Sequence, residues 1–169
     1  QPGWQRLIEL QPGQKVGNWR DSEFGLGNGR YPYDVNAVFV PAALAAIGRI
    51  ADSGLLTPHI VSATAKTFAG ATALAKVWLD SAPPLFAVLL GPADARDEIE
   101  AYAASVGVNA APALATIVNE PVRFCALALD AQGAPVPVQN SDAGFALLFL
   151  DLPPDTAVQI GTSVARPFP

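Results

Sequence analysis

Cysteine and histidine are almost absent from this 169-residue chain, and each shortage excludes a kind of chemistry. Cys125 is the only cysteine, so the chain cannot form an internal disulfide or a thiolate metal cluster by itself. His59 is the only histidine, so a zinc site or a Ser-His-Asp triad would depend on that one residue. We therefore expect no metal site and no cofactor.

Charged residues are also few, at 15% of the chain, and the net charge is −5. No run of basic residues could follow a phosphate backbone, which argues against nucleic acid as a partner. The longest apolar runs, such as residues 143–150, fall short of the about 20 residues that cross a bilayer, so we expect no membrane partner. The chain is 51% hydrophobic, which is enough to fold one domain around a real core.

Residues 1–36 are dense in glycine and proline, which excludes a long helix there and leaves at most a short strand or turn at residues 6–10. Apolar side chains then recur at three- and four-residue spacing from Val35, which predicts a helix that runs to Gly54. Pro41 lies a few residues into this helix, so we expect a kink or a late start.

Three further helices are predicted in the middle of the chain. Thr57-Pro58 supplies a cap and a first-turn proline for a helix that reaches Asp80. A third helix spans about residues 91–106, with acidic residues in its first turn, and a short fourth helix covers about residues 112–118.

The period becomes strand-like from Val122, and the turn sequence at residues 130–133 predicts one β-hairpin at residues 122–139. Ser141 is expected to cap a brief helix that ends near Phe149, before a last amphipathic turn or two. The chain therefore reads as a single, mainly α domain over residues 1–169, with a loop-rich segment at residues 1–36 and one hairpin.

The loop at residues 19–36 is far richer in chemical groups than the rest of the chain. Aromatic rings pack against the C–H face of a sugar, while carboxylates, amides and guanidinium groups bind its hydroxyls. Cleavage of a glycosidic bond also requires two carboxyl groups, one protonated and one ionised. The catalytic candidates are Asp21, Glu23 and Asp34, and the candidates for sugar binding in the loop are Trp19, Arg20, Tyr31, Tyr33 and Asn36.

A purely structural reading stays open for each part of this set. Loops of this composition are commonly turns, so Asp34 would be only a helix cap and Trp19 only an anchor to the core. A second constellation, Asn140-Ser141-Asp142, adds Asn140 and Asp142 to the sugar-binding candidates, or simply caps the helix that follows it.

Several motifs resemble those of a known family. Gly17-Asn-Trp-Arg-Asp-Ser and Gly29-Arg-Tyr-Pro-Tyr-Asp-Val-Asn-Ala resemble the (α/α)6-toroid, six-hairpin glycosidases, a group that includes glucoamylase-like and glycogen-debranching-like proteins. Asn140-Ser-Asp-Ala-Gly-Phe and Arg166-Pro-Phe-Pro are similar to later blocks of a bacterial branch of that group. The resemblance implies a helical toroid whose inward loops form a sugar cleft, with catalysis by carboxylates and no cofactor.

Two departures from the family matter. A toroid of this kind needs about a dozen helices, and a chain of this length has room for about four to six. We therefore expect helical hairpins of an incomplete toroid, completed by another chain or by the remainder of a larger polypeptide that covers exposed apolar faces. Ala143 stands where the related block has an acidic residue, which weakens the case for catalysis there.

The sequence thus favours a glycoside hydrolase, or a portion of one, that cleaves an α-linked glucan or oligosaccharide by acid/base catalysis. The alternatives are a non-catalytic carbohydrate-binding module and a structural or assembly fragment of a larger protein. A lone cysteine suits either side of a membrane, so the compartment stays open, with a periplasmic or secreted location slightly favoured.

Overall fold

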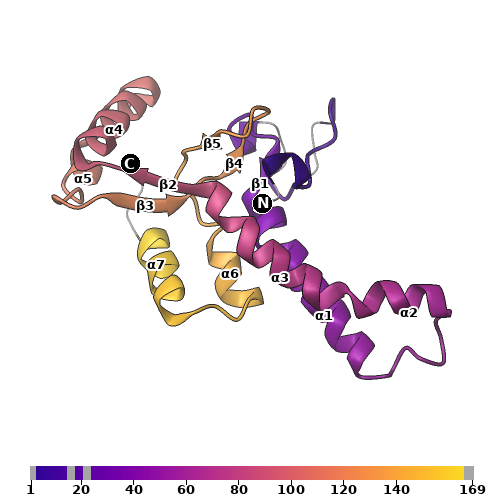
Figure 1. Ribbon diagram of the computed structural model, residues 1–169. Helices are drawn as coiled ribbons and strands as arrows, with labels where there is room; N and C mark the ends of the chain where they lie inside the picture. The colour runs from indigo at the N-terminus through magenta and orange to yellow at the C-terminus, as the bar shows by residue number, and fades with distance from the viewer. Residues whose placement is uncertain (1–2, 15–17, 21–23, 166–169) are drawn as a thin grey trace.

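The computed structural model describes residues 3–14, 18–20 and 24–165. Helices make up 54% of the described residues and strands 9%. Two small sheets lie near the middle of the molecule, and three helices extend from them as a long arm, namely α1 (Val40–Asp52), α2 (Ser62–Ala69) and α3 (Ala71–Ser81) (Figure 1). The expected mainly α fold of helical hairpins from an incomplete toroid is therefore wrong. The chain is a mixture of helices and small sheets, because residues 31–32 and 87–90, which were not expected to form strands, pair with other segments.

The first predicted helix is present, and its start is unusually wide. A π-helical segment, η3 (Asp34–Phe39), leads directly into α1 (Val40–Asp52), and the N–H of Val40 bonds to the carbonyl of Val35, five residues back. Pro41 has no N–H to donate, and its ring would crowd the carbonyl four residues before it in a regular helix. The wider turn relieves that conflict, and it places Asp34 and Asn36 inside the protein.

Residues Asp34–Asp52 form one continuous helix of 19 residues with a mean hydropathy of 1.4. By length and composition alone, this helix could cross a membrane. The core helix of a soluble protein or a signal sequence near the N-terminus has the same properties, so this is weak support for a span. In the structure this helix packs against α3 and α6 (Gly144–Phe149). The absence of a membrane partner stays a prediction.

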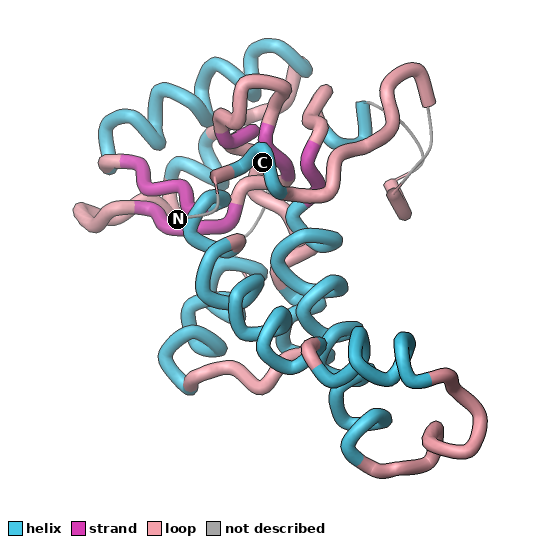
Figure 2. The backbone as a smooth tube through the Cα atoms, turned by 45° about the vertical axis from the view of Figure 1, so that its right-hand side comes forward, coloured by secondary structure: helices cyan, strands magenta, loops and turns pink. Residues whose placement is uncertain are grey.

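The second predicted helix is split, and its start is wrong. The chain turns through residues 55–61, and α2 (Ser62–Ala69) is separated by Gly70 from α3 (Ala71–Ser81). Glycine is a poor helix former, so the helix is interrupted at Gly70 although the apolar pattern continues through it. The resulting arm is seen clearly in Figure 2, where α2 and the loop before it form its far end.

Close packing of α1 on α3 depends on Gly48. A Cβ atom added there would lie 2.1 Å from Oγ1 of Thr72. We expect Gly48→Ala to lower the free energy of unfolding by about 1–3 kcal/mol, because the helices must move apart or Thr72 must change rotamer. Gly161→Ala in α7 (Pro154–Val164) is the matched control, since an added Cβ meets nothing within 4 Å there. Urea denaturation would show Gly161→Ala as neutral or stabilising; equal losses for both variants would contradict this packing.

Two antiparallel sheets replace the single expected hairpin. The first has the order β1 (Tyr31–Pro32), β4 (Ala128–Leu129), β5 (Pro135–Val136), and the second pairs β2 (Ala87–Leu90) with β3 (Val122–Cys125). The hairpin predicted at residues 122–139 is thus wrong in its first strand, because β3 pairs with β2 rather than with β5. Its turn is confirmed, since Asp130 Oδ1 accepts bonds from the N–H groups of Gln132 and Ala134.

The third predicted helix is confirmed as α4 (Pro92–Val106), which ends at Gly107 in the left-handed conformation. The fourth is shorter than predicted. The remaining elements are η1 (Trp4–Arg6), η2 (Phe24–Leu26), η4 (Pro83–Phe86), α5 (Ala111–Leu114), α6 (Gly144–Phe149) and α7 (Pro154–Val164).

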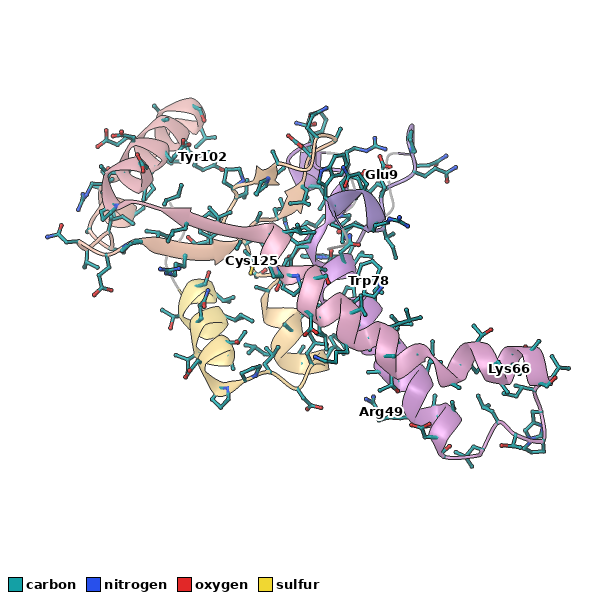
Figure 3. The ribbon with its side chains drawn as sticks, viewed as in Figure 1. Glu9, Arg49, Lys66, Trp78, Tyr102 and Cys125 are labelled. Atoms are coloured by element: carbon teal, nitrogen blue, oxygen red, sulfur yellow. The ribbon has the colours of Figure 1, made fainter. Side chains whose placement is uncertain are left out.

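The core lies where β1, η3, the β2–β3 sheet and α6 meet. Tyr33 packs edge-on against Phe86, with ring centroids 5.4 Å apart, and Tyr31 packs edge-on against Trp4 at 5.5 Å. Cys125 is close to this centre, as its label in Figure 3 shows, and its partly buried thiol contacts Tyr33. Trp4, Tyr31 and Tyr33 of the loop-rich N-terminal segment therefore pack in or against the core.

Candidate functional site

A cluster of polar side chains lies where the N-terminal loop meets η3 and the start of α6. We call it the acid cluster; it consists of Asn18, Arg20, Asp34, Asn140 and Asp142. Its members come from three stretches of sequence that the fold brings together. The packing of α6 on η3 makes this possible, because Phe39 of η3 lies against Phe145 and Phe149 of α6, with ring centroids 5.3 and 5.7 Å away.

Arg20 and Asp142 form a two-point ion pair in the acid cluster. Nε of Arg20 donates to Oδ2 of Asp142 at 3.0 Å, and Nη2 donates to Oδ1 at 2.7 Å. The Asp142 side chain is fully buried, whereas 22% of the Arg20 side chain remains exposed. Planar, two-point pairs of this kind fix the orientation of both groups. The hydrogen bonds to Asp142 also raise the pKa of Arg20.

Asn140 holds the backbone at Asp142. Its Oδ1 accepts the N–H of Asp142 at 2.9 Å, while its Nδ2 donates to the carbonyls of Val138 and Cys125 at 2.9 and 3.2 Å. The N-cap of α6 is Ala143 rather than Ser141, the predicted cap. Asn140 and Asp142, predicted as sugar ligands, therefore lie together in the acid cluster, and their side chains are engaged by the protein.

Asp34 is the second carboxyl group of the cluster. Nδ2 of Asn18 donates to both of its oxygens, at 2.9 and 3.0 Å, and Oδ1 of Asn18 accepts the N–H of Arg20. Only 1% of Asp34 is exposed. Burial raises the pKa of Asp34, and the nearby charge of Asp142 adds to this, whereas hydrogen bonds from the Val35 N–H and Asn18 and the charge of Arg20 oppose it. Asp34 thus holds its proton to a higher pH than an ordinary aspartate.

This shift has a measurable consequence for stability. Because the folded state binds the Asp34 proton more tightly than the unfolded state, the free energy of unfolding should fall as the pH rises from the ordinary value of 3.8 through the raised pKa. We expect Asp34→Asn to remove this contribution, so that the wild-type chain loses stability relative to the variant across this window. Urea denaturation from about pH 3.5 to pH 7 measures the difference. If the wild-type chain instead gains stability relative to Asp34→Asn as the pH rises, the raised pKa is contradicted. Asp52→Asn, at an exposed position, controls for the loss of one charge.

Trp19 forms the exposed edge of the site. It is 53% exposed, packs edge-on against Phe145 at 6.0 Å, and carries the Arg20 guanidinium carbon 4.7 Å from its ring centroid. A cation over an indole face is attracted by the π electrons of the ring. Arg20 therefore links the exposed indole to the buried Asp142.

The other predicted sugar ligands lie inside the protein. Tyr31 and Tyr33 are 6% and 3% exposed, and burial raises the pKa of Tyr33. The Asn36 amide is fully buried and bonds to backbone groups, accepting the N–H of Ile8 at 2.7 Å and donating to the carbonyls of Ile8 and Pro32 at 3.0 and 2.9 Å. These three residues support the site from the core. Asp21 and Glu23 lie outside the described residues.

Two features of the site carried no signal in the sequence. Asn18, the direct partner of Asp34, stood among many loop polars with nothing to single it out, and the Arg20–Asp142 pair joins residues 122 positions apart. Within residues 3–14, 18–20 and 24–165, no group of three or more His, Cys, Asp or Glu side chains is arranged to hold a metal ion.

No protein-family model, curated protein or solved structure matches this chain.

Proposed function

We propose that this chain forms the carbohydrate-binding cleft of a glycoside hydrolase, or of a portion of one, that acts on an α-linked glucan or oligosaccharide. The observation that carries the proposal is an exposed indole beside a guanidinium that is bonded to one buried carboxyl group, Asp142, with a second buried carboxyl group, Asp34, whose pKa is raised, in the same cluster. The proposal assigns the indole as the stacking surface, the guanidinium as the hydrogen-bonding cation and Asp34 as the acid.

Trp19 and Arg20 are the proposed sugar contacts. The exposed face of an indole suits the C–H side of a pyranose ring, because both are flat and apolar. The guanidinium keeps part of its surface exposed while Asp142 fixes its plane, so the remaining N–H groups can meet sugar hydroxyls without further ordering of the side chain.

Asp34 is the proposed general acid. A general acid must still carry its proton near the working pH, and burial together with a neighbouring carboxylate raises the pKa of Asp34 in that direction. Because Asn18 occupies both Asp34 oxygens, a glycosidic oxygen would reach the carboxyl group only after the Asn18 amide moves aside. The second reacting carboxylate is proposed to be Asp21 or Glu23, on the sequence argument alone.

A second candidate is a non-catalytic binding module, and a specific observation favours it. Both carboxyl groups described in the cluster already have protein partners, Asp142 with Arg20 and Asp34 with Asn18. Such a cluster could serve only to hold Trp19 and Arg20 in place for sugar binding. Both candidates are expected to bind sugar, so only a measurement of turnover separates them.

Calorimetric titration with maltose, maltotriose and longer malto-oligosaccharides tests the shared claim. We expect saturable binding that Trp19→Ala weakens about tenfold, the loss expected for one aromatic contact. Leu148→Ala is the control, because Leu148 is an exposed apolar residue on α6, at 76% exposure. If no oligosaccharide binds, or if both variants bind as the wild type does, the carbohydrate proposal fails. A panel of aryl glycosides then tests for turnover.

The helical arm supports a proposal about partners. Leu55 and Val61 at its far end are 72% and 70% exposed, and Leu74 and Val77 on α3 are 51% and 50% exposed. Several large apolar side chains exposed on one arm are consistent with an interface. We propose that another chain, or the remainder of a larger polypeptide, covers the arm.

When the chain is purified alone, no other polypeptide covers the arm, so we expect the chain to associate with itself in a concentration-dependent way. Size-exclusion chromatography with light scattering measures this association. Leu74 and Val77 lie three residues apart on α3, so the double change to lysine should shift the chain towards monomer. Val158→Lys on α7, at 69% exposure, is the control. A chain that is monomeric at all concentrations would contradict this use of the arm.

A further inference from the structure

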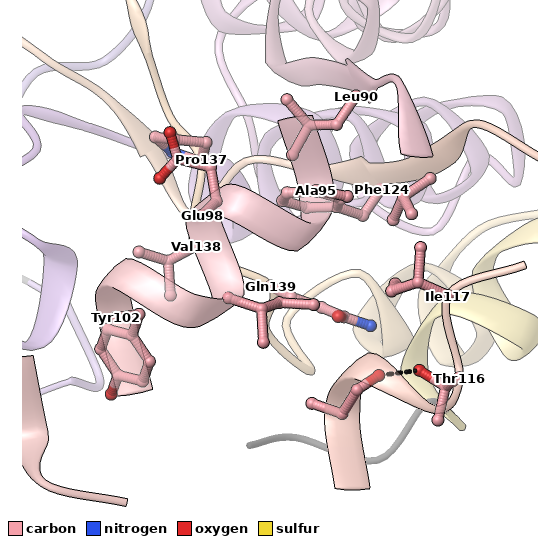
Figure 4. A pocket seen from close by; sticks show the side chains of 13 residues that line it. Leu90, Ala95, Glu98, Tyr102, Thr116, Ile117, Phe124, Pro137, Val138 and Gln139 are labelled. Carbon is pink, nitrogen blue, oxygen red and sulfur yellow. Dashed lines mark hydrogen bonds between the residues drawn. The ribbon is translucent and has the colours of Figure 1, made fainter. Parts of the chain in front are cut away.

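A cavity of about 360 Å³ lies away from the acid cluster, between α4 and the β2–β3 sheet. One wall is a single face of α4, where Ala95, Glu98, Ile99 and Tyr102 recur at helical spacing. Figure 4 shows Glu98 and Tyr102 projecting from α4 on one side, with Ile117 and Thr116 on the other.

The floor of the cavity is apolar, and strand pairing fixes the positions of its side chains. Leu90 pairs with Val122 across the sheet, and Phe124 lies two residues further along β3, so all three side chains point to the same face. Ala113 and Ile117 close the floor from the α5 side, and both are buried. The volume falls within the range of small-molecule sites.

The shape of the cavity is held by a bond between its two sides. Nη2 of Arg96 donates to the carbonyl of Ile117 at 2.6 Å, which ties α4 to the segment that follows α5. Gln139, on another side, is held in turn by a bond from its Nε2 to the carbonyl of Ser163 at 2.7 Å. The cavity is therefore pre-formed rather than dependent on closure.

The negative charge at the cavity favours a positively charged ligand. Glu98 is the one charged residue that lines it among the described residues, and no Lys or Arg of that part of the chain does so. Tyr102 lies four residues from Glu98 on the same helix face, and it is 57% exposed. A carboxylate beside an exposed aromatic ring attracts an organic cation, through charge and through the π face of the ring.

We propose that this cavity binds a small organic cation, namely an amine attached to an apolar group the size of one ring. The apolar group fills the floor formed by the sheet and α5, and the ammonium group lies at Glu98 and Tyr102. The proposal is independent of the carbohydrate site, because it shares no residue with the acid cluster.

Amide chemical-shift titration of the whole chain with 2-phenylethylamine tests this. We expect saturable shifts on α4, α5 and the β2–β3 sheet, and affinity at least about fivefold higher than for 3-phenylpropionate, which has the same ring but the opposite charge. Glu98→Gln should remove most of this preference, while Glu100→Gln, exposed on the same helix, should retain it.

Ala113→Leu should fill the floor and weaken binding of 2-phenylethylamine more than tenfold. If that variant does not fold, the comparison of Glu98→Gln with Glu100→Gln decides. Equal affinity for the amine and the carboxylate, equal behaviour of the two glutamate variants, or shifts confined to other parts of the chain would each overturn the proposal.

Discussion

Replacing Arg20 with methionine should lower the free energy of unfolding by about 3 kcal/mol or more, the largest loss that we expect from one change in the acid cluster. The Asp142 carboxylate would keep its fully buried position and lose both hydrogen bonds from the guanidinium. An uncompensated charge in the interior costs several kcal/mol, far more than the lost contact itself. Urea denaturation at pH 7 measures the loss.

Two variants make this prediction sharp. Arg20→Met combined with Asp142→Leu removes both charges, and it should recover most of the lost stability, because a buried pair can be replaced by apolar groups at little cost. Lys76→Met removes one partner of the exposed Lys76–Asp80 pair, 2.9 Å apart on α3, and should change stability by less than about 0.5 kcal/mol. Equal effects of Arg20→Met and Lys76→Met would show that the Arg20–Asp142 pair is not buried as described.

Turnover should fall about 10²–10⁴-fold in Asp34→Asn if the chain is a glycoside hydrolase, because the variant cannot supply a proton to the leaving oxygen. Oligosaccharide affinity should change by less than about threefold, since Trp19 and Arg20 remain in place. The measurement is kcat on an aryl glycoside, beside calorimetric binding of a malto-oligosaccharide to the same preparations. Asp52→Asn on α1, an exposed carboxylate, is the matched control.

The outcome also separates the two candidate functions. Wild-type chain that binds oligosaccharides and never turns over an aryl glycoside is a binding module, and Asp34 then serves to hold Asn18 and the loop. Turnover that survives in Asp34→Asn would remove Asp34 from the chemistry and leave the sequence candidates Asp21 and Glu23.

The sequence predicted those elements whose signal is local. The apolar period from Val35, the acidic first turn of α4 and the turn at Asp130 each depend on neighbours within a few residues, and each is present. Strand β2 was missed because Ala87–Leu90 is a four-residue apolar run without alternation, and periodicity cannot assign such a run. Its partner β3 was then paired with the wrong strand.

The candidate site was predicted in part for a related reason. Composition showed that the loop before the first helix is rich in groups suited to sugars, but it could not show which of them face inward. Asn36 and Tyr33 have the chemistry of sugar ligands, yet both lie in the core. There the Asn36 amide is hydrogen-bonded to backbone groups, and the Tyr33 ring packs against Phe86. The toroid expectation was wrong because it came from short motifs, which do not specify how the segments between them pair.

The central claim is that Trp19, Arg20 and the acid cluster form one carbohydrate site, and a residue-level binding map tests it most directly. Amide and indole N–H shifts of isotope-labelled chain would be followed during titration with maltotriose. The account predicts saturable shifts of the Trp19 indole N–H and of amides at residues 18–20, 34–36 and 140–146, all sharing one dissociation constant. An unchanged Trp19 indole signal, with shifts absent or confined to the α1–α3 arm, would contradict it.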